Sequence, residues 1–179
     1  RFLYDVRRMK ETLRNEKSAF VFDAQAAMTE FSARLPFTLT DAQKKVCLEI
    51  SRDFMSGSVM NRLVQGDVGS GKTAVAAAAL YAVWHAGFQG ALMAPTEVLA
   101  RQHYRTFSEL FGEAEDGPRI GILTGSTRAK ERRELLEKLA QGKVDILIGT
   151  HALLEERVVF SSLALVVTDE QHRFGVQQR

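Results

Sequence analysis

Two groups of residues along this chain could together do phosphate chemistry. The first is the string GDVGSGKT at residues 66–73, which has the spacing G-x-x-x-x-G-K-T. Glycines at these positions let a loop turn tightly enough to aim backbone N–H groups at phosphate oxygens. The second is the acidic pair Asp169 and Glu170, which follows the apolar run 163–168. The combination is typical of proteins that bind a nucleoside triphosphate with magnesium.

Within the first string, each residue type suits a phosphate. Lys72 would reach the β- and γ-phosphates, and Thr73 would ligate Mg²⁺. A helix that starts at the loop would add about half a positive charge. The alternative is a glycine-rich turn with an incidental lysine, which the expected strand before the loop and helix after it disfavour. The predicted nucleotide-binding residues are Gly66, Asp67, Val68, Gly69, Ser70, Gly71, Lys72 and Thr73.

The acidic pair follows a strand that is apolar throughout, as expected for a strand buried on both faces. Asp169 would emerge at the carboxyl edge of the sheet and hold Mg²⁺ directly or through water. Glu170 would orient and deprotonate the attacking water, so it indicates hydrolysis rather than binding alone. Taken alone, the pair would be interpreted as part of a surface turn. Together with the loop, it predicts Lys72, Asp169 and Glu170 as the catalytic residues.

Short apolar runs alternate with longer helical patterns after Pro36, which is the signature of an α/β fold. Crossovers of this length require parallel strands, and right-handed connections place helices on both faces of the sheet. Ligands are then expected at the carboxyl ends of the strands. We predict helices at 40–54, 72–85, 97–111 and about 128–140, and strands at 61–65, 91–94, 120–123, 145–148 and 163–168.

A different pattern precedes this fold. Apolar residues recur at helical spacing near the start, at Phe2, Leu3, Val6, Met9 and Leu13. Pro36 disfavours helix at Leu35, so we place a boundary there. Residues 1–35 are predicted to be a helical linker or an appendage from a preceding domain, and residues 36–179 the nucleotide-binding domain. Because the sequence lacks an initiator Met and a signal peptide, we expect a piece of a longer protein.

Composition narrows the class of protein. Of 179 residues, 45% are hydrophobic and 26% charged, which excludes a disordered chain. No apolar run approaches the roughly 20 residues that cross a bilayer, so we expect no membrane partner. The net charge of +2 does not decide for or against a nucleic acid. Cys47, a single cysteine among apolar neighbours, predicts a buried, inert thiol in a reducing, cytoplasmic compartment.

Six segments occur in the order found in superfamily-two DNA helicases: FTLTDAQ (37–43), GDVGSGKT (66–73), APTEVLARQH (94–103), TGS (124–126), GTHAL (149–153) and DEQHRFGV (169–176). Together they resemble the bacterial RecG family, which remodels stalled forks and recombination junctions. The resemblance covers residues 35–179. DEQHRFGV is its most specific segment, because the related transcription–repair coupling translocases carry DEEHRFGV. Gln171 therefore favours the RecG type.

The resemblance implies the first RecA-like motor lobe of an ATP-dependent DNA helicase, with ATP and Mg²⁺ as cofactors. It implies forked or branched DNA as the partner, in DNA repair and recombination, and a monomeric parent with a second RecA-like lobe and a wedge domain. Because the second lobe supplies arginines to the phosphoryl group, we expect this chain alone to bind ATP weakly and hydrolyse it poorly. Two alternatives remain: a transcription–repair coupling type of double-stranded DNA translocase, or a nucleotide-binding module without turnover.

The resemblance also assigns roles to residues outside the phosphate-binding loop and the acidic pair. Gln43 would contact adenine, with Phe37 packing near the base; alternatively Thr40 and Gln43 form a capping box, and both roles can coexist. His172 would link the ATP site to the next motif, or would be a core or turn histidine. Thr96 could be only a helix N-cap. DNA contact is implied for Thr96, Glu97, Arg101, Thr124, Gly125, Ser126, Thr150 and His151.

Two further groups of side chains are expected to be structural. The basic residues Arg128, Lys130, Arg132 and Arg133 could form a nucleic-acid patch, but glutamates at 131, 134 and 137 interleave with them at helical spacing. We therefore predict a self-paired, solvated helix face. The spacing of Trp84, His103 and Phe107 suits helix faces that pack on the sheet.

Overall fold

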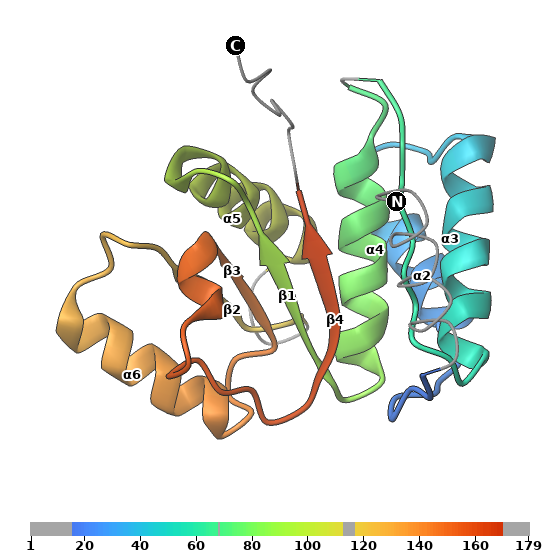
Figure 1. Ribbon diagram of the computed structural model, residues 1–179. Coiled ribbons are helices and arrows are strands. Elements are labelled where there is room, and N and C mark those ends of the chain that lie inside the picture. The colour runs from blue at the N-terminus through green and yellow to red at the C-terminus, as the bar shows by residue number, and fades with distance from the viewer. Residues whose placement is uncertain (1–15, 68, 113–116, 170–179) are drawn as a thin grey trace, which may run out of the picture. The chain divides into compact units, whose positions relative to one another are not determined.

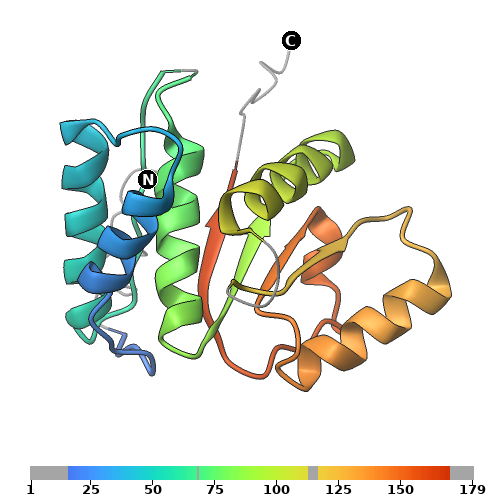
Figure 2. The ribbon, with the colours of Figure 1, turned by 180° about the vertical axis from the view of Figure 1, so that it is seen from behind.

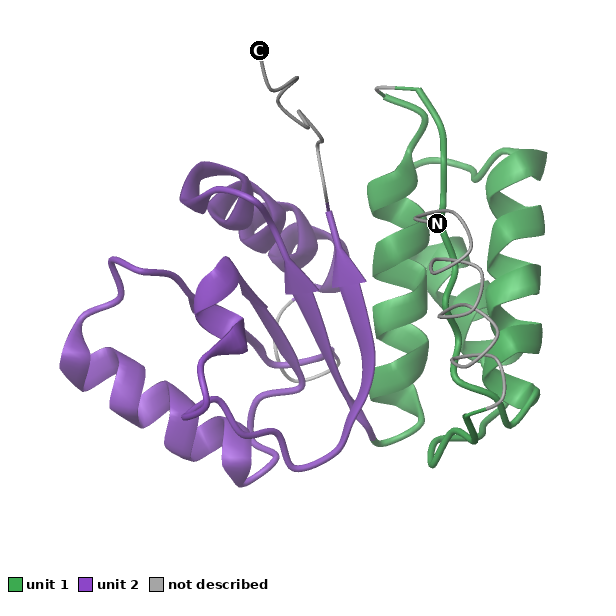
Figure 3. Cartoon of the chain, in the orientation of Figure 1, with its two compact units in different colours: residues 1–87 green, residues 88–179 purple. Residues whose placement is uncertain are grey.

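The structure is a computed structural model that describes residues 16–67, 69–112 and 117–169 (Figure 1). The helix expected near the start, Val68 of the loop, and Glu170, Gln171 and His172 lie outside the described residues. The chain divides into two compact units, residues 1–87 and 88–179 (Figure 3). The phosphate-loop string belongs to the first unit and Asp169 to the second.

The described part of the first unit is helical. It contains α2 (Gln25–Arg34), α3 (Asp41–Met55) and α4 (Lys72–His85), and α2 packs against both other helices. The Phe31 ring of α2 lies 5.1 Å from the Tyr81 ring of α4, and the Tyr81 hydroxyl donates to Glu30 over 3.0 Å. Most of α4 is buried, on all of its faces, as its run of alanines and other apolar residues predicts.

Polar residues at their N-caps explain why two helices begin where the sequence predicted. The Thr40 hydroxyl accepts from the Gln43 N–H at 3.3 Å, and Gln43 Oε1 accepts from the Thr40 N–H at 2.8 Å, so the predicted capping box is present at the start of α3. The Thr96 hydroxyl accepts from the Leu99 N–H at 3.3 Å and caps α5 (Glu97–Phe111). Both predicted capping roles are confirmed.

The second unit is built on a parallel sheet, as predicted. Its strands are β1 (Gln89–Met93), β2 (Ile120–Leu123), β3 (Ile146–Gly149) and β4 (Leu163–Thr168), in the order β2-β3-β1-β4. All three strand pairs are parallel, so the carboxyl ends of the strands share one edge. The register pairs Met93 with both Gly149 and Thr168, which aligns the ends of β1, β3 and β4.

Helices cover both faces of this sheet. Helix α5 packs on β2 and β3 and crosses the face that is turned toward the viewer in Figure 2. Helix α6 (Ala129–Ala140) packs on the other face, where Leu139 forms a buried cluster with Leu123 and Leu147. The short 3₁₀-helix η1 (His151–Leu154) follows β3, and its Ala152 joins the same cluster. The predicted α/β architecture is confirmed.

The strand predicted at residues 61–65 is wrong. This segment has no regular secondary structure, and its Leu63 is 79% exposed. Only two of its five residues are apolar, and Arg62 donates to Glu49 at 2.6 Å and to Asp53 at 2.7 Å, both on α3. These two ion pairs hold the segment beside α3, a constraint that the apolar pattern did not reveal.

The charged face of α6 is solvated, as predicted, but it is not self-paired. Among the described residues, Arg132 is the one basic side chain of this face with an ion pair, and its partner is Glu155 beyond η1. An ion pair within one helix stabilises it by only a few tenths of a kcal/mol, because both side chains lose rotamer freedom. A carboxylate on a neighbouring segment can therefore replace the partner on the same helix.

Cys47 is buried on α3, as predicted, and burial raises the pKa of its thiol. A protonated, shielded thiol is a poor nucleophile, which agrees with an inert side chain. Within the described ranges, no helix combines the length and the apolarity that crossing a bilayer requires.

Candidate functional site: a phosphate loop and a sheet edge

The segment that leads into α4 forms a tight loop. Gly69 and Gly71 have φ angles of +83° and +77°, and the Ser70 N–H donates to the Asp67 carbonyl at 3.0 Å. Left-handed backbone at two glycines turns successive N–H groups toward one side, which makes a concave anion-binding surface. The local geometry that the glycine spacing predicted is therefore present.

Helix α4 begins without a side-chain cap, in contrast to α3 and α5. Its N-cap residue is Gly71, which has no side chain that could accept from the first N–H groups. Those N–H groups and the helix dipole favour an anion at this position. An anion bound here would thus take the place that a Thr hydroxyl takes in the other two helices.

Lys72 is held across the loop by backbone carbonyls. Its ammonium donates to the Gly66 carbonyl at 2.5 Å and to the Asp67 carbonyl at 3.0 Å. An ammonium has three N–H donors, so two carbonyls fix its position while one donor is left for a phosphate oxygen. Thr73 is the next residue and lies half-buried in the first turn of α4.

Gln43 connects the start of α3 to the loop. Besides its part in the capping box, its side-chain Nε2 donates to the Ser70 carbonyl at 2.9 Å. The contact is close, because a Cβ on Gly71 would overlap that same amide nitrogen. Gln43 thus makes the predicted cap and also supports the loop; its contact with adenine stays a prediction.

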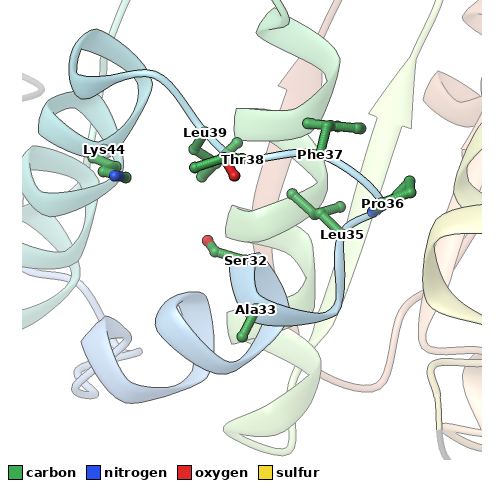
Figure 4. Close-up of a pocket in the computed structure, with 8 residues that line it drawn as sticks. All are labelled: Ser32, Ala33, Leu35, Pro36, Phe37, Thr38, Leu39 and Lys44. Atoms are coloured by element: carbon green, nitrogen blue, oxygen red, sulfur yellow. The ribbon is translucent and has the colours of Figure 1, made fainter.

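Phe37 lies at a pocket of about 380 Å³ between the end of α2 and the start of α3 (Figure 4). Phe37 is 46% exposed, so the residue is accessible from solvent. An exposed ring near the Gln43 helix is available to a planar base. The lining residues are Ser32, Ala33, Leu35, Pro36, Phe37, Thr38, Leu39 and Lys44.

Asp169 stands at the carboxyl edge of the sheet in the second unit. Its N–H donates to the Met93 carbonyl at 2.8 Å, which extends the β4–β1 pairing by one residue. Its side chain is 31% exposed, and its Oδ2 lies 2.6 Å from His103 Nε2. We did not predict this contact: His103 was interpreted as a packing residue, and no spacing in the sequence connects residues 66 positions apart.

The segments expected to contact DNA meet at the same edge of the sheet. Glu97 Oε1 accepts from Arg101 Nε at 3.1 Å and Nη2 at 2.8 Å, and it also accepts from the Ser126 hydroxyl. Ser126 is in turn 3.2 Å from the Thr124 hydroxyl. Two hydrogen bonds lower the pKa of Glu97: the one from Ser126 has the larger effect, and the one from Arg101 adds to it. The Glu97 carboxylate therefore stays charged at neutral pH.

A groove opens beside this network, with a volume of about 620 Å³. Hydroxyls, guanidinium groups and one carboxylate line it together with two aliphatic side chains. The hydroxyls and guanidinium groups suit a sugar–phosphate backbone rather than base edges. Its lining residues are Arg101, Ile122, Thr124, Ser126, Thr127, Arg128, Glu131 and Leu135.

Thr150 and His151 follow the neighbouring strand, β3. The Thr150 N–H donates to the Leu123 carbonyl at 3.3 Å, so Thr150 comes next to the start of the 124–126 turn. His151 is exposed at the first position of η1, and Gly125 is exposed in the turn. The predicted DNA-contact residues after β1, β2 and β3 therefore lie along one edge; their contact with DNA stays a prediction.

The loop, the parallel sheet and the carboxylate at its edge define a RecA-like P-loop fold. The DEAD/DEAH box helicase family matches residues 40–179, and the chain belongs to this family. The ATP-dependent DNA helicase RecG of Bacillus subtilis is 56% identical over 152 residues, and that of Staphylococcus aureus is 55% identical over 149 residues. The resemblance that the motifs predicted is confirmed.

A solved structure, "Structure of RecG bound to three-way DNA junction", superposes with a TM-score of 0.84 at 42% identity and covers 93% of this chain. The Bacillus and Staphylococcus matches cover 85% and 83% of this chain but only 22% and 21% of those relatives. The chain thus spans about a fifth of the length of the relatives that it matches.

Proposed function

We propose that this chain is the ATP-binding motor lobe of an ATP-dependent DNA helicase that acts on branched DNA in repair and recombination. The observation that carries the proposal is the glycine loop, whose left-handed residues, uncapped helix and oriented Lys72 would suit an anion. The relatives at 55–56% identity are named RecG, which favours this assignment over a transcription–repair coupling translocase. The parent would work in the cytoplasm as a monomer.

The nucleotide would be shared between the loop and the sheet edge. Lys72 would hold the β- and γ-phosphates, while Thr73 and Asp169 would ligate Mg²⁺, which neutralises charge on the transferred phosphoryl group. Mg²⁺ is usually bound through one or two carboxylates plus phosphate oxygens. Asp169, at the carboxyl edge of the sheet, would supply one such carboxylate.

Hydrolysis would depend on Glu170, the residue after Asp169. A carboxylate next to the metal ligand can orient the attacking water and accept its proton. Lys72 and Thr73 belong to one compact unit and Asp169 to the other, so the proposal requires the two units to converge on one triphosphate.

DNA would lie along the edge formed by the segments after β1, β2 and β3. Thr96 and Ser126 are exposed, and with the N-terminus of α5 they offer polar groups that can bind phosphate without reading base sequence. Thr124 is buried, so it would shape the turn rather than contact DNA with its hydroxyl. We further propose that residues 36–179 form the motor domain, that residues 1–35 are a helical appendage, and that a second RecA-like lobe and a wedge domain complete the parent protein.

The first test replaces Lys72 by Ala and Glu170 by Gln in the full-length protein. Losing the charged contact of Lys72 should weaken ATP binding by about 1.5–3 kcal/mol, or roughly 10- to 100-fold. Glu170→Gln should keep ATP binding but lower DNA-stimulated turnover by about 10²- to 10⁴-fold, because a general base is lost. Fluorescent-nucleotide titration and a phosphate-release assay measure the two effects.

Lys45→Ala is the matched control, since Lys45 is an exposed lysine of α3 outside the loop. It should leave both measurements unchanged. If Glu170→Gln turned ATP over at the parental rate, the chain would not be a hydrolytic motor of this kind; if Lys72→Ala bound ATP normally, the loop would not be its phosphate site.

A further inference from the structure

His103 makes a short, shielded contact with the carboxylate at the sheet edge. Its Nε2 lies 2.6 Å from Asp169 Oδ2, and the His103 side chain is only 13% exposed. The ring stands 6.0 Å from the ring of Phe107, a residue with no exposed surface, one turn further along α5. A hydrogen bond that water cannot easily reach is stronger and more directional than one in bulk solvent.

The direction of this hydrogen bond follows from the two groups. An ionised carboxylate can only accept, so the proton must sit on His103 Nε2 whether or not the ring carries a charge. The bond therefore engages Oδ2 and leaves the other carboxylate oxygen of Asp169 for a further ligand.

Asp169 is thus held at two points by one stretch of chain. Its backbone N–H is bound to the carbonyl of Met93, the last residue of β1, and its side chain is bound to His103 on α5, the helix that follows β1. A carboxylate fixed in this way loses little rotamer freedom when it coordinates a cation.

We propose that His103 is a positioning residue of the ATP site, which fixes the Asp169 carboxylate in the orientation that ligates Mg²⁺. The inference rests on the proposed role of Asp169 as a magnesium ligand. Groups that hydrogen-bond to a metal ligand orient it, and losing one commonly weakens metal binding by about 10- to 100-fold.

The experiment compares His103→Phe with His103→Gln in the full-length protein. Phe keeps a flat ring in the packing against Phe107 but has no donor, whereas the Gln side-chain amide presents an N–H at a similar distance from the backbone. Mn²⁺, used in place of Mg²⁺ and followed by electron paramagnetic resonance, is titrated into each protein with a non-hydrolysable ATP analogue. We expect His103→Phe to weaken Mn²⁺ binding by about tenfold, and His103→Gln to recover most of that loss.

Two further variants distinguish the possible failures. His85→Phe removes an exposed histidine of α4 and should bind Mn²⁺ as the parent does. Asp169→Asn should weaken Mn²⁺ binding; if it does not, the proposed role of Asp169 fails and the inference fails with it. If Asp169→Asn weakens binding but His103→Phe does not, only the positioning role is overturned. Equal weakening in His103→Phe and His103→Gln, with a lowered melting temperature in both, would also overturn it, because packing would then explain the effect.

Discussion

Gln43 shows how one side chain can serve the fold and the site together. Its Oε1 accepts from the Thr40 N–H and completes the cap of α3, while its Nε2 donates to the Ser70 carbonyl in the phosphate loop. The helix start and the loop are therefore connected through a single amide. A substitution that removes one of these atoms but not the other can separate the two roles.

Gln43→Glu and Gln43→Ala should differ in this way. Glu keeps an acceptor for the Thr40 N–H but cannot donate to Ser70, so we expect near-parental thermal stability and ATP binding weakened by about 1 kcal/mol, roughly fivefold. Ala also loses the acceptor for the Thr40 N–H, which is one half of the capping box, and should cost about 0.5–1.5 kcal/mol of stability. Thermal unfolding and nucleotide titration measure the two effects; equal melting temperatures for both variants would contradict the capping role.

At the scale of elements, α5 relates two parts of the site. Glu97 in its first turn and Arg101 one turn later both contact Ser126. His103, about 9 Å along the helix axis from Glu97, contacts Asp169. A rigid helix with both contacts offers a direct physical connection between the edge where DNA would bind and the carboxylate that would hold magnesium.

Strands β2 and β3 approach so closely at Gly149, the last residue of β3, that this position has no room for a side chain. A Cβ there would overlap the carbonyl oxygen of Leu123, the paired residue at the end of β2, and would also press on the Leu153 side chain. We expect Gly149→Ala to lower the free energy of unfolding by about 1–3 kcal/mol, because backbone atoms must move apart.

Gly125→Ala is the matched control for this change, since open space surrounds its Cβ position. Its effect on stability should stay within about 0.5 kcal/mol. Chemical denaturation of the chain with each substitution gives both values, and a Gly149→Ala protein as stable as Gly125→Ala would show that the strand ends can separate without strain.

The elements that could be predicted from the sequence are those whose signals are local. Thr40 and Thr96 mark helix starts, and the apolar run before Asp169 marks β4 at its observed bounds. The same run predicted a strand buried on both faces, which is wrong: β4 ends the described sheet, and its Val166 is 53% exposed. Residues 1–35 were predicted to be helical, but the bounds of α2 were not, because its N-cap, Ala24, makes no side-chain cap and its apolar pattern is the short buried set Ala24, Ala27, Met28 and Phe31. The ion pairs of Arg62 and the His103–Asp169 bond join segments distant in sequence, so no local rule could reveal them.

At the scale of the whole molecule, we propose that this chain supplies only part of a catalytic site. The chain spans about a fifth of the RecG relatives that it matches. Its described loop and sheet edge contain residues suited to phosphate and magnesium, but the charge that develops during phosphoryl transfer is commonly stabilised by arginines from another lobe. Binding and turnover should therefore respond differently to the rest of the protein.

We expect the 179-residue chain on its own to bind ATP weakly. It should hydrolyse ATP about 10³- to 10⁵-fold more slowly than the full-length protein, because an arginine finger commonly accelerates hydrolysis by that factor. Forked DNA should not stimulate the chain, because stimulation requires DNA and the second lobe to close on the same nucleotide. Steady-state phosphate release with and without a synthetic fork, for both proteins at equal concentration, makes the comparison. Fork-stimulated turnover by the chain alone would mean that this lobe carries a complete catalytic site and that the arginines are not needed.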